Sequence, residues 1–257
     1  MQVAETLGMH HSTISRWERG DTMPDEADTA GLLAIYGITG EERDRLVGIA
    51  RQDTIADWVA PGIGRQLAAL IEYERRAERI TEVNPLTIPG LVQTRDYAKA
   101  LMLGAGLPLG RAETGSIVRM GRQSILMQRR PPRLTAIIGE QAIRYPVCDD
   151  AIMADQLHHL LAVGQRPNVE ILVLPMDRHR YSIALEGRFI LLEFPRDKPV
   201  VHLESHCSSS ILTNPAAVAS YQDAVDSIRA QAMTAAESAT YLKEIEHDHD
   251  ALAQKQS

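Results

Sequence analysis

Residues 3–20 read VAETLGMHHSTISRWERG, and this stretch predicts two short helices joined by a tight turn. Val3, Ala4 and Leu7 give the first helix an apolar stripe, and the small Ala4 at its centre allows a second helix to cross closely. Gly8 accepts the positive φ that ends a helix and turns the chain sharply.

The second helix, over about residues 12–19, has an inner and an outer face. Ile14 and Trp17 are three residues apart and face the first helix. Either His11 or Ser12 can cap the helix, and Gly20 ends it. The outer face carries His11, Ser12, Ser15 and Arg16.

This segment resembles the phage-repressor-type (Cro/XRE) helix-turn-helix, because Ala4, Gly8, Ile14, Glu18 and Gly20 all fall on the spacing of that family. The resemblance implies that the second helix enters the major groove of double-stranded DNA. His11, Ser12 and Arg16 would then face bases, and Arg16 has the chemistry to contact guanine O6 and N7. Thr13 and Arg19 would contact phosphates, so the implied DNA-binding set is His11, Ser12, Thr13, Ser15, Arg16 and Arg19.

The chain departs from that family at its beginning. The family places a complete helix before the first helix seen here, and a Gln that contacts phosphate near the start of that first helix, whereas this sequence starts at Met1. Glu18 commonly pairs with a basic residue on the missing helix. Two interpretations stay open: the true start lies upstream of Met1, which we favour, or intact DNA binding has been lost.

Two further helices are expected to complete a small N-terminal domain over residues 1–55. The first spans residues 25–36 and ends at Gly37, and the second follows Thr39. Pro61, Gly62 and Gly64 break the pattern within residues 53–64, so a domain boundary is expected there.

The remainder predicts a larger α+β domain over residues 58–247, followed by a disordered tail over 248–257. Helices are expected over residues 66–80, 111–130, 150–163 and 216–247, with Glu74 on the outer side of the first. β-like runs are residues 134–138, 169–174, 188–194 and 200–203.

This half is similar to the C-terminal domain DUF5753 of helix-turn-helix regulators in actinomycetes. The motifs that carry the similarity include Ile88-Pro89-Gly90-Leu91-Val92-Gln93-Thr94, Tyr97-Ala98, Arg119, Arg122-Gln123, Glu140 and Glu204. The resemblance implies a regulator. It also makes a small partner protein from a neighbouring gene an option.

Residues 111–144 are strongly basic, with seven Arg against two Glu. Arg119, Arg122 and Arg129 are spaced to lie near one helical face. They either bind an anionic ligand or partner, or pair with acids elsewhere in the fold. Exchange of Arg122 and Arg129 for Glu would leave the thermal midpoint unchanged in the first case and lower it in the second.

Carboxylates that follow apolar strands offer a second candidate site. Glu140 and Glu204 could line one pocket at the sheet edge, or bind Arg144 or a helix end. His202, His206 and Cys207 fit no standard zinc spacing, so no metal is expected. Common nucleotide-binding and hydrolase motifs are missing from the sequence, so we expect neither an enzyme nor a cofactor.

Charge and composition bound the function. The net charge of −7 argues against a non-specific nucleic-acid binder. Two cysteines and no membrane-length apolar stretch indicate a cytoplasmic protein with no membrane partner. The sequence therefore predicts a sequence-specific DNA-binding transcriptional regulator, controlled at its C-terminal domain by a ligand or partner protein. The alternative is an antitoxin-like or sequestering protein with weakened DNA binding. A homodimer is compatible with either.

Overall fold

Two units follow one another along the chain in the computed structural model, Met1–Gly62 and Ile63–Ser257. The structure describes residues 2–18, 24, 26–51, 65–176, 181–204 and 209–256. The division lies in the segment where Pro61, Gly62 and Gly64 interrupt the helical pattern.

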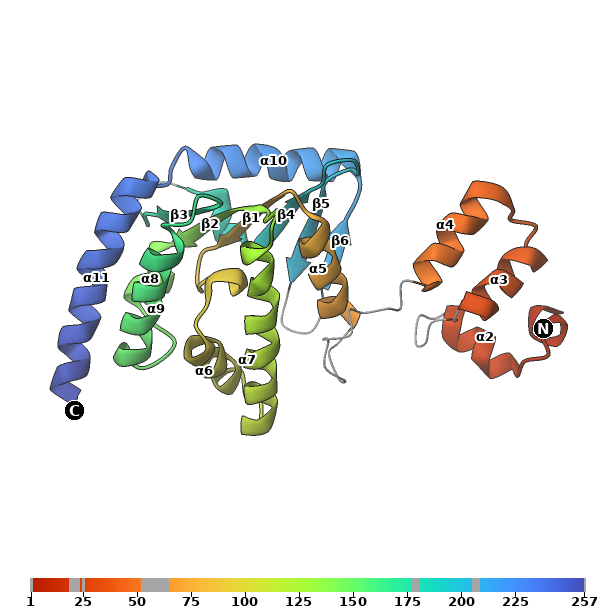
Figure 1. Ribbon diagram of the computed structural model, residues 1–257, viewed down its shortest axis with the longest axis horizontal. Coiled ribbons are helices and arrows are strands. Elements are labelled where there is room, and N and C mark those ends of the chain that lie inside the picture. Colours follow the sequence, from red (N-terminus) through yellow and green to blue (C-terminus); the bar gives the residue numbers. More distant parts are fainter. Residues whose placement is uncertain are drawn as a thin grey trace. The chain divides into compact units, whose positions relative to one another are not determined.

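The N-terminal unit consists of short helices in the part that the structure describes (Figure 1). They are α1 (Gln2–Thr6), α2 (His11–Glu18), α3 (Glu26–Ile35) and α4 (Gly40–Arg51). Gly8 adopts a φ of 65° between α1 and α2, the conformation that the sequence predicted for this turn. Gly31 of α3 leaves room for Leu7, since a Cβ on Gly31 would lie 2.8 Å from Leu7 Cδ2.

Helix α2 begins one residue earlier than the sequence predicted. His10, rather than His11 or Ser12, takes the cap position, because its carbonyl oxygen accepts from Thr13 N at 2.9 Å. Its Nδ1 lies 2.7 Å from Ser12 Oγ and accepts from Ser12 N at 3.4 Å. A ring nitrogen thus replaces the hydroxyl or carboxylate that more often caps a helix.

A six-stranded mixed sheet organises the C-terminal unit, in the order β3-β2-β1-β4-β5-β6. Strands β1, β2 and β3 are parallel, and β4, β5 and β6 continue the sheet by antiparallel pairing. The strands are β1 (Arg79–Asn84), β2 (Arg133–Gly139), β3 (Val169–Leu174), β4 (Phe189–Glu193), β5 (Val200–Glu204) and β6 (Ser209–Leu212). The predicted α+β class is confirmed.

Helices cover both faces of this sheet (Figure 1). Helix α10 packs on one face over Val83, Ile137 and Leu191, and the larger core on the other face includes Ile80 and Ile138. The helical elements are α5 (Arg65–Arg76), η1 (Gly90–Val92), α6 (Arg95–Gly104), α7 (Leu109–Gln123), η2 (Ser124–Met127), α8 (Glu140–Arg144), α9 (Asp150–Val163), η3 (Ile183–Glu186), α10 (Pro215–Arg229) and α11 (Ala235–Gln256).

The predicted helix over 66–80 is wrong at its end. Helix α5 stops at Arg76, and residues 79–84 form β1, which pairs with β2 on one side and β4 on the other. Glu74, expected on the outer side, is 1% exposed. The four strands that the sequence predicted are present as β2, β3, β4 and β5. Strands β1 and β6 were not predicted.

Two helix ends also differ from prediction. The basic helix expected over 111–130 ends at Gln123, where Ser124 Oγ donates to Gly121 O and the chain tightens into η2. At the C-terminus, the disordered tail expected from residue 248 is helical to Gln256. Buried His249 anchors it, with Nδ1 2.7 Å from Asp150 Oδ1 and Nε2 3.0 Å from Ile143 O.

Candidate functional site

Helix α2 separates an exposed polar side from a buried apolar side. Ile14 is buried, as is Ala4 of α1, so this side faces the interior of the N-terminal unit. His11, Ser12 and Arg16 are exposed. Because each residue turns the helix by about 100°, Ser12 and Arg16 lie about 40° apart on the side opposite Ile14, whereas His11, in the first turn, lies about 60° from Ile14. The helix therefore presents a surface of hydrogen-bonding side chains.

The other predicted DNA-contacting residues are placed differently. Thr13 and Ser15 are half-buried at the sides of α2. Arg19 lies outside the described residues. His11, Ser12 and Arg16 are exposed, as expected for the predicted outer face, whereas Ser15, also expected there, is half-buried.

In the C-terminal unit, strand register gathers polar residues on one face of the sheet. Glu82 of β1 is opposite Ile190 of β4, which is opposite His202 of β5. Directly opposed residues project to the same face, and Asn84, two residues after Glu82, projects there as well. Glu82 is 6% exposed and Asn84 is 3% exposed. A buried face that should be apolar is thus polar at one end.

A cavity of about 220 Å³, here called the polar cavity, adjoins these residues. Its polar lining includes Glu82, Asn84, Gln93, Arg119, His202 and Glu204. Arg122 also lines the cavity and forms a bidentate pair with Glu74, with Nε 3.0 Å from Oε2 and Nη2 2.5 Å from Oε1. Both partners are buried, so this pair satisfies its own charges.

The loop that carries the sequence motif of residues 88–94 forms one wall of the cavity. Arg119 Nη1 donates to Gln93 Oε1 at 2.8 Å, and Gln123 Nε2 donates to Gln93 O at 2.7 Å. From α9, Gln156 Nε2 donates to Val92 O at 2.9 Å and its Oε1 accepts from Thr94 N at 2.6 Å. Side chains from two helices therefore fix the loop in place.

Two acceptor atoms at the cavity lack partners among the described residues. Glu82 Oε1 accepts from Asn84 Nδ2 at 2.8 Å and from Gly90 N at 3.1 Å, but Glu82 Oε2 and Asn84 Oδ1 are buried with no hydrogen bond. Burial raises the pKa of Glu82 above its ordinary value, although the nearby Arg122 opposes the rise. Buried acceptors of this kind normally have a partner.

Arg119 and His202 also line the polar cavity, and burial shifts the pKa of each. Burial and the neighbouring Arg122 lower the pKa of Arg119 to about 10, so the guanidinium is still charged at neutral pH. Burial lowers the pKa of His202, which keeps its ring neutral under the same conditions. Among the described residues, no carboxylate forms an ion pair with Arg119.

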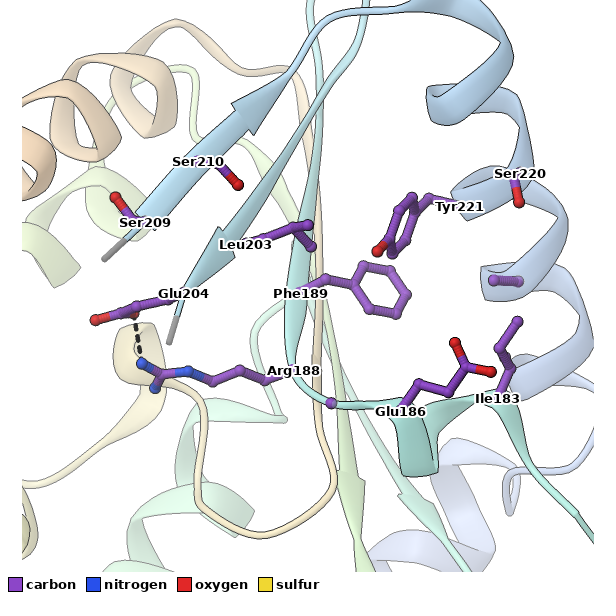
Figure 2. A pocket seen from close by; sticks show the side chains of 12 residues that line it. Ile183, Glu186, Arg188, Phe189, Leu203, Glu204, Ser209, Ser210, Ser220 and Tyr221 are labelled. Atoms are coloured by element: carbon purple, nitrogen blue, oxygen red, sulfur yellow. Dashed lines mark ion pairs between the residues drawn. The ribbon is translucent and has the colours of Figure 1, made fainter. Parts of the chain in front are cut away.

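The ion pair between Arg188 and Glu204 borders two cavities. Arg188 Nη2 lies 2.7 Å from Glu204 Oε2, and both residues line the polar cavity and a cavity of about 460 Å³ near α10. Figure 2 shows Phe189 next to Tyr221 in the second cavity, whose lining also includes the polar residues Glu186, Ser209, Ser210 and Ser220. The pair leaves Arg119 as the cation of the polar cavity that has no carboxylate partner within the described part of the chain.

The predicted basic face of Arg119, Arg122 and Arg129 does not form. Arg122 points inward to Glu74, Arg119 to Gln93, and Arg129 lies beyond α7 and is exposed. The internal-acid interpretation therefore holds for Arg122. Its reason is geometric, because α7 ends before Arg129 and turns Arg122 toward α5.

Glu140 and Glu204 do not share a pocket. Glu140 binds Arg144 Nε at 2.6 Å and accepts from Met176 N at 2.9 Å, as the alternative prediction had it. Glu204 ends β5, which is three positions from β2 in the sheet, or about 14 Å at the usual strand spacing. Both residues lie at the edge of the sheet where β2 and β5 end, but they are too far apart to act together on one ligand.

Three cavity residues, Glu82, Asn84 and His202, were not predicted as a site, and neither was Glu74, which binds the cavity residue Arg122. Glu74 follows Leu67, Leu70 and Ile71 by seven, four and three residues, so helical periodicity alone places it inside. No comparable signal exists for Glu82, because its strand lacks an alternating apolar pattern.

The described residues contain neither a metal-type cluster nor a helix able to cross a membrane. Within the described ranges, no group of three or more His, Cys, Asp or Glu side chains is placed to hold a metal ion. His206 and Cys207, weighed above as ligands, lie outside those ranges. None of the described helices is long and apolar enough to span a membrane.

Family models match both units. Residues 67–244 match the domain of unknown function DUF5753, and residues 1–46 match a helix-turn-helix domain. The chain belongs to the DUF5753 family, because that match covers more than half of its length. No curated protein and no solved structure matches it. The helix-turn-helix domain indicates a DNA-binding regulator.

Proposed function

We propose that this protein is a sequence-specific, Cro/XRE-type transcriptional regulator that acts in the cytoplasm and reads double-stranded DNA with α2. The observation that carries the proposal is the exposed pair Ser12 and Arg16 opposite the buried Ile14, with the exposed His11 at the start of the same helix. A helix of this kind fits the major groove, where its side chains reach base edges.

The C-terminal unit supplies control rather than catalysis in this proposal. Its Glu74–Arg122 pair is internally satisfied, and Glu140 and Glu204 are each bonded to an arginine. What supports control by a small molecule is the polar cavity, which has acceptor atoms without partners among the described residues. A ligand there would act by favouring one of two states that differ in DNA affinity.

Arg16→Ala tests base recognition. DNA sequences would first be selected from a random duplex pool with the natural chain and then titrated by fluorescence anisotropy. If Arg16 contacts guanine, its loss costs about 1–3 kcal/mol, concentrated at one base position. Arg19→Ala should instead weaken all sequences alike and flatten the salt dependence.

Arg43→Ala provides the matched control, because Arg43 is on α4 and pairs with its neighbour Asp44. It should leave the sequence preference unchanged. Identical profiles for the Arg16 and Arg19 variants would show that the wrong helix face has been assigned. Failure to select any sequence would favour an antitoxin-like or sequestering protein.

A further inference from the structure

A narrow recess opens beside the polar cavity. It has a volume of about 20 Å³ and is lined by Glu82, Asn84, Arg188, Ile190, His202 and Glu204, with Phe189 at its side. A space of roughly 10–15 Å³ holds one water-sized group. The recess therefore fits a single small polar group, such as an ammonium, a hydroxyl or a water molecule.

The recess calls for a hydrogen-bond donor. Glu82 Oε2 and Asn84 Oδ1 are both acceptors, and both are buried without a partner in the described part of the chain. The orientation of the Asn84 amide is fixed, because Nδ2 donates to Glu82 Oε1 and a flip would set two oxygens against each other. A group with two or more N–H or O–H donors in the recess would supply the missing hydrogen bonds to both Glu82 Oε2 and Asn84 Oδ1.

A cation fits better than a neutral donor. Arg122 and Arg119 both interact electrostatically with Glu82, but Arg122 is already bound on two nitrogens by Glu74 and Arg119 donates to Gln93. No described residue forms an ion pair with Glu82. A buried carboxylate without a bonded cation is costly, and an ammonium group would both neutralise it and donate to it.

Arg119, which also lines the polar cavity, has the opposite deficit. Arg119 uses one nitrogen on Gln93 and pairs with no carboxylate among the described residues. Arg188, the other cation nearby, is held by Glu204. An anionic group would therefore find its strongest partner at Arg119.

We propose that the polar cavity binds a small zwitterion, an amino acid or short amino-carboxylate, with its ammonium in the recess at Glu82 and Asn84 and its carboxylate at Arg119. The cavity of about 220 Å³ is below the usual range for drug-sized ligands and suits a molecule of this size. The binding site itself is inferred from the cavity alone and not from the assignment of DNA binding. Its role as the control signal rests on the proposed function.

Binding should weaken as the pH falls. The ammonium needs the ionised Glu82, whose pKa burial raises, so protonation of Glu82 removes the attraction. The other charged or titratable groups around the recess are Glu74, Arg119, Arg122, Arg188, His202 and Glu204. Of these, His202 would add positive charge on protonation, which acts in the same direction.

The test uses the full chain with the standard amino acids and 4-aminobutyrate as probes, followed by isothermal calorimetry and thermal unfolding. Butylamine, butyrate and glycerol supply an ammonium, a carboxylate and hydroxyls separately. At least one zwitterion should bind and raise the thermal midpoint, and the three partial probes should bind far more weakly. Absence of binding by every zwitterion, or an equal response to glycerol, would overturn the proposal and leave water as the occupant of the recess.

Glu82→Gln separates binding from folding. The variant keeps an acceptor for Gly90 N but removes the buried charge, so the free protein should unfold at the same or a higher temperature. Its affinity for the zwitterion should fall by about 30-fold or more, the minimum expected when one member of a buried charge pair is lost. Glu170→Gln, on β3 away from the cavity, should bind normally. Unchanged affinity in Glu82→Gln would refute the assignment, whatever the result of the DNA experiments.

Discussion

Arg122→Met should cost the C-terminal unit about 3–5 kcal/mol of stability, because it strands a buried carboxylate. Glu74 is 1% exposed and Arg122 is 5% exposed, and each is the ion-pair partner of the other. For a domain of this size the loss corresponds to a fall in Tm of about 6–20 °C. Thermal unfolding followed by circular dichroism would measure it.

Two variants define the comparison. Arg75→Met removes an ion pair with Glu72 on the exposed side of α5, the helix that also carries Glu74. Exposed pairs of this kind contribute about 0–1 kcal/mol to stability. The double variant Glu74→Leu with Arg122→Met should recover most of the stability, because no charge is then left unpaired. If Arg122→Met lowered Tm no more than Arg75→Met does, the buried pair would not have the structural role assigned to it.

Gly139→Ala is expected to be the next most damaging change. Gly139 is buried where β2 passes into α8, and an added Cβ would lie 2.8 Å from the C and Cα atoms of Pro85 and closer still to its carbonyl oxygen. The obstacle is backbone and cannot rotate away. The cost should reach or exceed the upper end of the 1–3 kcal/mol range typical of overpacking, roughly 3 kcal/mol in urea unfolding.

The damage should extend to the polar cavity, since Pro85 directly follows Asn84 at the end of β1. Gly110→Ala is the matched control, because a Cβ there meets nothing within 4 Å in α7. Alanine is a better helix former, so that variant should be unchanged or slightly more stable. Equal urea midpoints for the two variants would contradict the close approach of Gly139 to Pro85.

The helix-turn-helix could be predicted from sequence because its signals are local. Gly8 has the expected positive φ, and Ile14 is buried on the expected side. The four predicted strands were recognisable for a similar reason, since runs such as residues 169–174 are almost wholly apolar.

Strand β1 was missed because its inward positions are not apolar. Its residues 79–84 read RITEVN, and the face that packs on the core carries Ile80, then Glu82, then Asn84. Two polar residues at inward positions remove the alternation that marks a strand. Glu82 and Asn84, which give the cavity its polar lining, are thus the residues that prevented recognition of β1. Polar residues at inward positions of a strand are expected where a functional site replaces ordinary core packing.

The basic helix was misjudged for a different reason. Its arginines were assigned to a surface by residue type, whereas Arg122 is bound by Glu74, which is 48 residues earlier in the chain. A partner that far away in the sequence produces no recognisable residue pattern in either segment. Only the tertiary structure distinguishes a solvated cation from one that is bound internally.

The position of β1 in the sheet also bears on how the chain is made. Arg79 of β1 is joined to Glu193 of β4 across 114 residues, so one edge of β1 stays open until β4 leaves the ribosome. At about 5–20 residues per second this takes roughly 6–23 s. During that interval an exposed edge strand invites pairing with other nascent chains, and inward-pointing charge discourages it. Glu82, an inward-pointing carboxylate of β1, is a residue of the kind that discourages such pairing.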